Sequence, residues 1–165
     1  MKWLLAGASG FLGTALRVRL AGEGQEVVRL VRREPATSTE IQWDPNSGTV
    51  DAAAFDEVDV AVNLAGVPVA PLPWTESRRE QILSSRVNTT STMARGLAAQ
   101  SNGRRRTLIQ ASGIARYGTT SGAEPYTEDS PAAADYRALA RSANPHSDGW
   151  RSRTFAAGST ARRIV

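Results

Sequence analysis

The sequence predicts an α/β protein built on a doubly wound parallel sheet, with helices on both faces. Short apolar runs alternate with amphipathic segments at helical spacing, and glycines follow the first and fourth of the runs. Parallel neighbours need crossover connections, so strands that alternate with helices in this order indicate a parallel sheet.

A strand, a glycine turn and a helix open the chain. Residues 2–6 (KWLLA) form a nearly continuous apolar run, which is typical of a strand buried on both faces of a parallel sheet. The run ends at Gly7. From residue 11 to residue 20 the apolar positions share one helical face, and Gly22 and Gly24 then end the predicted helix. This order of elements begins a βαβ unit.

The remaining elements are predicted from the same two patterns, short apolar runs for strands and apolar residues at helical spacing for helices. Further strands are predicted at residues 26–31, 41–43, 58–65 and 107–111. A turn at residues 44–48 (DPNSG) ends the short third strand. The polar segment at residues 75–100 carries its apolar residues at helical spacing, so it is predicted to be one long amphipathic helix.

The sequence changes in character after Pro131. Residues 132–165 are rich in Arg, Ser, Ala and Gly, and their apolar runs are too short to bury much surface. Residues 132–143 are compatible with a helix, and the chain beyond them is predicted to be irregular. We therefore predict a folded domain at residues 1–131 and an irregular, Arg-rich tail at residues 132–165.

The net charge of +4 belongs to that tail. Residues 1–131 carry 14 basic and 14 acidic side chains, whereas residues 132–165 carry six arginines against two aspartates. A neutral body disfavours a nucleic-acid surface built into the fold, although an Arg-rich tail can bind polyanions weakly.

Composition also argues against several kinds of site. Without cysteine there is no disulfide and no Cys-based metal site, and with the single histidine His146 we predict no metal centre. The apolar run near the N-terminus is too short for a signal peptide or a membrane helix. The expectation is a cytoplasmic protein that has no membrane partner.

A glycine motif of the form GxxGxxG stands directly after the first strand and opens the first helix. The first glycine allows a tight turn, the second lets a pyrophosphate approach the backbone, and the third lets helix and strand pack closely. The N–H groups at the helix start would then bind a dinucleotide diphosphate. The residues predicted to contribute are Gly7, Ser9, Gly10, Phe11, Leu12 and Gly13. The motif predicts a Rossmann-type domain, and the alternative is an ordinary glycine turn.

Two arginines indicate which dinucleotide is bound. An NAD site usually offers a carboxylate at the end of the second strand to hold the ribose hydroxyls, but here Val31 is followed by Arg32 and Arg33. A guanidinium binds phosphate with a fork of donors, whereas a carboxylate would repel it. We therefore predict NADP rather than NAD, with Arg32 or Arg33 on the 2′-phosphate. The alternative is a pair of solvated loop residues.

Several segments together resemble the extended short-chain dehydrogenase/reductase superfamily, and within it the branch of epimerase-family proteins (NAD-dependent epimerase/dehydratases). They occur in order and at natural spacing over about four fifths of the chain. The segments are GASGFLG at 7–13, LVRR at 30–33, WDPNSGTVD at 43–51, NLAG at 63–66, WTESRREQILSSRVNTT at 74–90, ASGIARYG at 111–118 and TEDSP at 127–131.

The resemblance implies roles for residues after two later strands. The turn at residues 63–66 would lie beside the adenine ribose, Asn88 on the long helix would brace that turn, and Ser112 would lie near the nicotinamide as a catalytic residue. The further cofactor contacts implied are Leu64, Ala65, Gly66, Asn88 and Ala111. The alternatives are a plain strand end, a helix-surface residue and a polar strand terminus.

The superfamily's chemistry is hydride transfer, in which Ser and Tyr hydroxyls polarise a carbonyl and a nearby Lys lowers the tyrosine pKa. The Tyr and Lys normally lie four residues apart on a helix. Here Tyr136 is followed at that spacing by Ala140, and Lys2 is the only lysine of the chain. Gly113 and Arg116 depart from the usual pattern as well. The resembled branch often lacks the Tyr/Lys pair, so the general acid/base is unassigned.

Superfamily members run to nearly twice this length, with a sixth strand and a substrate-binding lobe after the serine strand. The sequence therefore predicts a sheet that is incomplete on its C-terminal side and a missing substrate lobe, as a truncated gene or a shifted reading frame would produce.

The function predicted is that of an NADP-binding Rossmann domain of an oxidoreductase- or epimerase-like protein, in which turnover is not supported and the substrate is an unidentified small molecule. The alternative is a non-catalytic NADP-binding sensor or regulatory domain. Superfamily dimers commonly pair through their long helices, so a homodimer through residues 75–100 is one expectation. The alternative is an incomplete sheet that exposes an aggregation-prone edge.

Overall fold

The computed structural model describes residues 1–69, 75–100, 103–112, 117, 127 and 129–131. The chain divides into two compact units, residues 1–109 and residues 110–165. The first unit holds nearly all of the described secondary structure. The helix and tail predicted for residues 132–165 lie outside the described residues, so the domain boundary at residue 131 stays a prediction.

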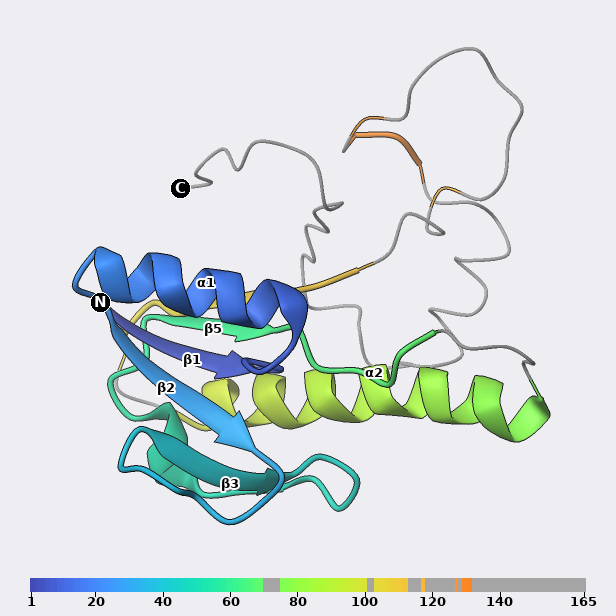
Figure 1. The fold of residues 1–165 in the computed structure, drawn as a ribbon, viewed down its shortest axis with the longest axis horizontal. Helices are drawn as coiled ribbons and strands as arrows, with labels where there is room; N and C mark the ends of the chain where they lie inside the picture. The colour runs from blue at the N-terminus through green and yellow to red at the C-terminus, as the bar shows by residue number, and fades with distance from the viewer. Residues whose placement is uncertain (70–74, 101–102, 113–116, 118–126, 128, 132–165) are drawn as a thin grey trace. The chain divides into compact units, whose positions relative to one another are not determined.

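A six-stranded, mostly parallel sheet forms the centre of the fold (Figure 1), in the order β4-β3-β2-β1-β5-β6. Its strands are β1 (Lys2–Ala6), β2 (Glu26–Val31), β3 (Glu40–Asp44), β4 (Thr49–Val50), β5 (Val60–Asn63) and β6 (Thr107–Gln110). β1 pairs in parallel with both β2 and β5, and β2 pairs in parallel with β3. The predicted α/β class and parallel sheet are confirmed.

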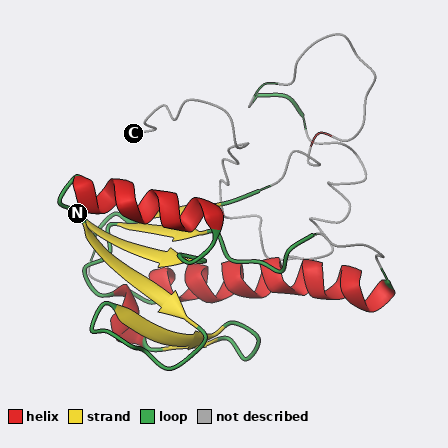
Figure 2. Ribbon diagram, viewed as in Figure 1, coloured by secondary structure: helices red, strands yellow, loops and turns green. Residues whose placement is uncertain are grey.

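Two helices cover opposite faces of the sheet, as Figure 2 shows. α1 (Phe11–Gly22) ends where Gly24 adopts φ +64°, and the N–H of Gln25 donates to the carbonyl of Leu20. α2 (Glu76–Ala98) begins at Thr75, whose hydroxyl accepts from the N–H of Arg78. The sheet is therefore doubly wound, as the sequence predicts.

The two faces bury separate apolar clusters because side chains alternate along each strand. The cluster under α2 consists of Leu4, Ala6, Val28, Leu30, Trp43, Ala54, Phe55, Val58, Ala61, Met93 and Leu97. The cluster under α1 consists of Leu5, Ala8, Leu20, Val60 and Val62. Leu4 and Leu5 are both fully buried, on opposite faces, so β1 is covered on both sides as its apolar run predicts.

Two short elements were not predicted. β4 pairs antiparallel with β3, because the turn at residues 44–48 ends at Gly48 with φ +73° and reverses the chain. A 3₁₀ helix, η1 (Ala52–Phe55), follows and is capped by the Asp51 carboxylate, which accepts from the N–H of Ala53. The strand predicted at residues 58–65 is shorter, because the Asn63 side chain takes the N–H of Ala65 and turns the backbone.

The connection between β2 and β3 has no helix. Its eight residues, 32–39, lead directly from one parallel strand to the next. This loop begins at the carboxyl end of β2, so it brings Arg32 and Arg33 to the edge of the sheet where the glycine turn also lies.

Neither helix of the described residues has the length and apolar character needed to cross a bilayer. Pairing of two copies through residues 75–100 stays a prediction. On that helix Leu83 is exposed.

Gly96 of α2 should be intolerant of a side chain. A Cβ there would lie 2.1 Å from the ring of Phe55, which is fully buried and cannot move away. Gly96→Ala should lower the free energy of unfolding by roughly 1–3 kcal/mol through overpacking. In the control Gly22→Ala, the new Cβ meets nothing within 4 Å, so stability should be unchanged or higher by up to about 1 kcal/mol. Equal denaturant midpoints for the two variants would contradict this packing.

Candidate functional site

Gly7 joins β1 to the glycine turn in a conformation that only glycine adopts readily. Its φ is +76°, and a Cβ on it would lie 2.6 Å from the carbonyl carbon of Leu64 and 2.7 Å from the amide nitrogen of Ala65. The backbone at residues 64–65 therefore packs directly on the backbone of the glycine turn. The two segments that the sequence predicts to face the cofactor are brought together by this contact.

The other two glycines differ in what surrounds them. A Cβ on Gly13 would lie 2.2 Å from the Gly7 carbonyl oxygen, so the first turn of α1 packs tightly on the glycine turn. A Cβ on Gly10 would meet only that same oxygen, at 3.4 Å, and Gly10 is exposed. Gly10 thus leaves open space outside the turn, as the approach of a diphosphate requires.

The start of α1 offers backbone donors at this open space. The Gly10 N-cap has no side-chain capping hydrogen bond, and the first turn carries no acidic residue. Thr14 donates its N–H to the Gly10 carbonyl at 2.8 Å, whereas within the described chain the N–H groups of residues 11–13 have no acceptor. Unpaired donors and the positive end of the helix dipole favour an anion here. The donor set fits a dinucleotide diphosphate.

Asn63 fixes the backbone of the turn after β5, at residues 63–65, to α2. Its side chain is fully buried, and its Nδ2 donates to the hydroxyls of Thr89 at 3.0 Å and Thr90 at 3.3 Å on α2. Its Oδ1 accepts from the N–H of Ala65 at 3.0 Å. Because β1 also fixes this turn through the Leu64 N–H and the Ala6 carbonyl, the backbone at residues 63–65 is held on both sides.

Two further residues of α2 continue this support. The Ser85 hydroxyl accepts from the N–H of Val67, and the Arg86 guanidinium donates to the Val67 carbonyl. Asn88 lies half-buried on the same helix but, within the described residues, makes no hydrogen bond to the turn. The observed bracing comes from its neighbours, which the sequence reasoning missed, and a role for Asn88 stays a prediction.

A buried carboxylate organises the arginines after β2. The side chain of Glu40 is 1% exposed. Its Oε1 lies 2.6 Å from Arg33 Nη2 and 3.0 Å from Arg29 Nη2, and its Oε2 accepts from Arg33 Nη1 at 2.9 Å and from the N–H of Ala36 at 2.7 Å. The hydrogen bonds from Arg33 and then from Ala36, together with the charge of Arg29, lower the pKa of the Glu40 carboxyl to about 2.

The two arginines named by the sequence therefore differ. Arg33 forms a two-pronged ion pair with Glu40, and the hydrogen bond to that carboxylate raises the pKa of Arg33. Arg32 is exposed and has no hydrogen-bonding or ion-pair partner in the described part of the chain. Hydrogen bonds from Ser47 and Asn46 lower the pKa of Asp44, and the charge of Arg32 adds to this effect.

The catalytic candidates are less well defined by the structure. Ala111 and half-buried Ser112 directly follow β6 and belong to the second unit. Lys2 is the first residue of β1, with its Nζ 3.7 Å from Glu26, so about 13 Å of strand separates it from the Gly7 edge. It cannot stand in for a lysine beside the nicotinamide. Tyr136, Ala140, Gly113 and Arg116 lie outside the described residues, and among those described no cluster of His, Asp or Glu could hold a metal.

The hydrogen bonds that Glu40 accepts from Arg33 and Ala36 predict a specific dependence of stability on pH. Its folded pKa of about 2 lies below the ordinary 4.5, so its stabilisation is fully present above about pH 4.5 and is lost as pH falls toward 2. We expect wild type to be more stable than Glu40→Gln near neutral pH, with the difference in urea midpoint shrinking through this acid range. A difference that does not change with pH would contradict the ion-pair network.

Comparisons with known proteins agree with this geometry. A family model described as the NAD dependent epimerase/dehydratase family matches residues 3–141. The epimerase family protein MT2273 of Mycobacterium tuberculosis is 39% identical over 116 residues, which are 70% of this chain and 38% of that protein. The match thus covers less than half the length of this curated relative.

Two solved structures are similar in fold. The human epimerase family protein SDR39U1, solved with NADPH, superposes with a TM-score of 0.69 at 30% identity, over 87% of this chain and 48% of that one. MoeE5, solved with UDP-glucuronic acid and NAD, has a TM-score of 0.65 at 24% identity, over 94% of this chain and 52% of that one, and shows likeness of fold alone. By its motif, its fold and the family model, the chain belongs to the NAD dependent epimerase/dehydratase family.

Proposed function

We propose that this chain binds NADP in preference to NAD. The observation that carries the proposal is the basic cluster at the carboxyl end of β2, where Arg32 is exposed and Arg33 is fixed at the start of the loop by Glu40. The related human protein solved with NADPH supports the choice. Because MoeE5 of similar fold was solved with NAD, the fold alone does not decide between the cofactors.

In this proposal the backbone holds the common part of both dinucleotides. The diphosphate takes the unpaired N–H groups of residues 11–13 and lies over Gly10, with Ser9 beside it. Leu64 and Ala65, which pack against Gly7, and the following Gly66 line the adenosine side of the site. The bound cofactor would supply a hydride, and the chain's own contribution is to orient it.

In this proposal the charged side chains at the end of β2 distinguish the 2′-phosphate of NADP from the 2′-hydroxyl of NAD. Arg29, Arg32 and Arg33 bring three positive charges, and the exposed Glu34, the nearby Asp44 and the buried Glu40 bring three negative ones. Glu40 is fully engaged by Arg33, Arg29 and the N–H of Ala36, so it is not available to accept hydrogen bonds from ribose hydroxyls. Arg32, whose guanidinium has no ion-pair partner in the described part of the chain, would favour a 2′-phosphate over a ribose hydroxyl.

Titration of the purified chain with NADP⁺ and NAD⁺ tests the proposal. Wild type should bind NADP⁺ more tightly, and Arg32→Gln should weaken NADP⁺ binding by about tenfold or more, since it removes a charge-assisted hydrogen bond. NAD⁺ binding is the internal control and should change by less than about twofold. Equal affinity of wild type for the two dinucleotides would overturn the assignment. Arg33→Gln should also weaken NADP⁺ binding, and should lower stability as well because Glu40 would lose its main partner.

We further propose that the chain binds the cofactor without turning over carbonyl substrates by the superfamily's usual proton transfer. Ser112 is the candidate hydroxyl, but Tyr136 has no lysine at four-residue spacing and Lys2 lies at the opposite end of β1. A non-catalytic sensor of NADP is the alternative role that this observation favours. Saturating NADPH with a panel of aldehydes and ketones should give no oxidation above the rate without protein. Measured turnover would favour an enzyme.

A further inference from the structure

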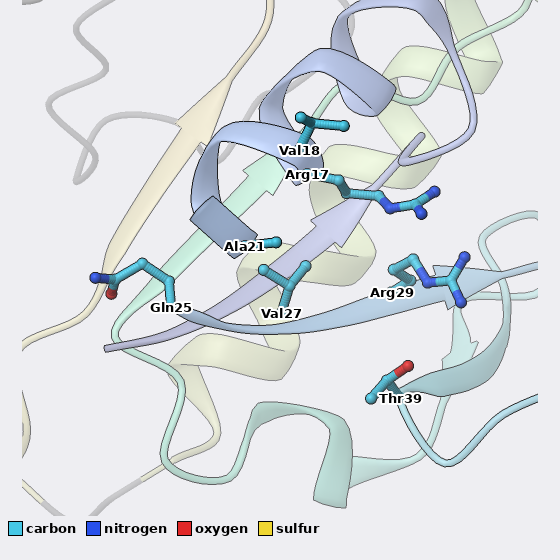
Figure 3. A pocket seen from close by; sticks show the side chains of 7 residues that line it. All are labelled: Arg17, Val18, Ala21, Gln25, Val27, Arg29 and Thr39. Atoms are coloured by element: carbon cyan, nitrogen blue, oxygen red, sulfur yellow. The ribbon is translucent and has the colours of Figure 1, made fainter. Parts of the chain in front are cut away.

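A hollow between α1 and β2 shares only Arg29 with the site described above. It has a volume of about 280 Å³. Its lining residues, labelled in Figure 3, are Arg17, Val18, Ala21, Gln25, Val27, Arg29 and Thr39. The hollow exists because the loop at residues 32–39 replaces the helix that would otherwise pack beside α1 on this face of the sheet.

Two guanidinium groups point to the same end of this hollow. Arg29 lies two residues beyond Val27 on β2, so both side chains project on the α1 face. On α1, side chains tilt toward the helix N-terminus, which carries the Arg17 guanidinium along β2 toward its carboxyl end. Figure 3 shows the Arg17 and Arg29 guanidinium groups at one end of the hollow and Gln25 at the other.

The charge at this end is not balanced within the described residues. Arg29 shares the single carboxylate of Glu40 with Arg33, at 3.0 Å and 2.6 Å. Arg17 has no carboxylate and no hydrogen-bond acceptor in the described part of the chain, although it is only half-exposed. Two like charges converging at one point are stabilised by an anion between them.

That end of the hollow adjoins the site of the 2′-phosphate in the proposed function. β2 ends at Val31, two residues beyond Arg29, and Arg32 and Arg33 follow directly. We infer that Arg17 is a further specificity-determining residue, which reaches from α1 across the hollow to the 2′-phosphate of NADP and binds it together with Arg29. This inference rests on the proposed function and adds a residue from a different element.

The test is a comparison of Arg17→Gln with Arg19→Gln. Both variants remove one positive charge from α1, but Arg19 is highly exposed and pairs with Glu23 instead of lining the hollow. The probes are adenosine 2′,5′-bisphosphate and adenosine 5′-monophosphate, titrated calorimetrically against the full chain. We expect Arg17→Gln to weaken binding of the bisphosphate by about tenfold, and binding of the monophosphate by less than about twofold. Arg19→Gln should change both affinities by less than about twofold.

The outcomes separate this inference from the proposed function. If wild type prefers the bisphosphate and the two variants lose equal affinity for it, Arg17 does not touch the phosphate and the inference is wrong, while NADP selection by Arg32 and Arg33 stands. If wild type shows no preference for the bisphosphate, both ideas fail. Arg17→Lys should recover part of the lost affinity, because a point charge replaces the fork of donors. Thermal unfolding of each variant without ligand checks that the fold is intact.

Discussion

The contact of backbone on backbone at Gly7 is the constraint on which the site depends. The turn after β1 and the turn after β5 approach so closely that no side chain fits between them. This approach needs a positive φ and no side chain at Gly7, and a partner turn whose backbone is held in place. Asn63 provides the last condition, since its buried amide fastens the second turn to α2 through Thr89 and Thr90. The N-terminus of α1 and the turn after β5 are thus held in fixed positions beside the space that a ligand would occupy.

A second constraint acts at the end of β2, where a loop connects β2 to β3 without a helix and is stabilised by the buried carboxylate of Glu40. Loops of eight residues between parallel strands are short, and their backbone needs partners. The Glu40 carboxylate accepts from the N–H of Ala36 and pairs with the guanidinium groups of Arg29 and Arg33, so this one negative charge holds the loop in its conformation. The same contacts fix Arg33 at the edge of the sheet and leave Arg32 exposed. In the proposed function, loop stability and cofactor selection therefore depend on the same ion-pair network.

The sequence predicted the elements whose signals are local. Apolar runs located the long strands, helical spacing located α1 and α2, and the glycine spacing located the ligand-binding turn. β4 and η1 were missed because two and four residues are too few to show a periodicity. The turn at residues 44–48 was predicted, but only the pairing of Trp43 with Val50 reveals that it closes a hairpin.

The residues of the site that the sequence did not reveal all depend on contacts distant in the chain. Glu40 reads as the polar residue before a strand, and its burial follows only from the register that sets it opposite Arg29. In the sequence, Thr89 and Thr90 look like ordinary helix residues. Only the fold shows that their hydroxyls accept hydrogen bonds from the Asn63 side chain. Arg17 reads as a solvated position on an amphipathic helix, as Arg19 is, and only the missing helix after β2 gives it a hollow to line.

In the proposed function, cofactor choice is accordingly a property of a charge cluster and not of one motif residue. A carboxylate close to the end of β2 would ordinarily favour ribose hydroxyls and hence NAD. Here the carboxylate is present, at Glu40, but it is buried and enclosed by guanidinium groups, so it acts on the arginines and not on a ligand. On the solvent side of the cluster, Arg32 has no ion-pair partner in the described part of the chain. Whether a Rossmann site selects a 2′-phosphate thus depends on which of its charges are compensated inside the protein, and that is set by strand register and loop length.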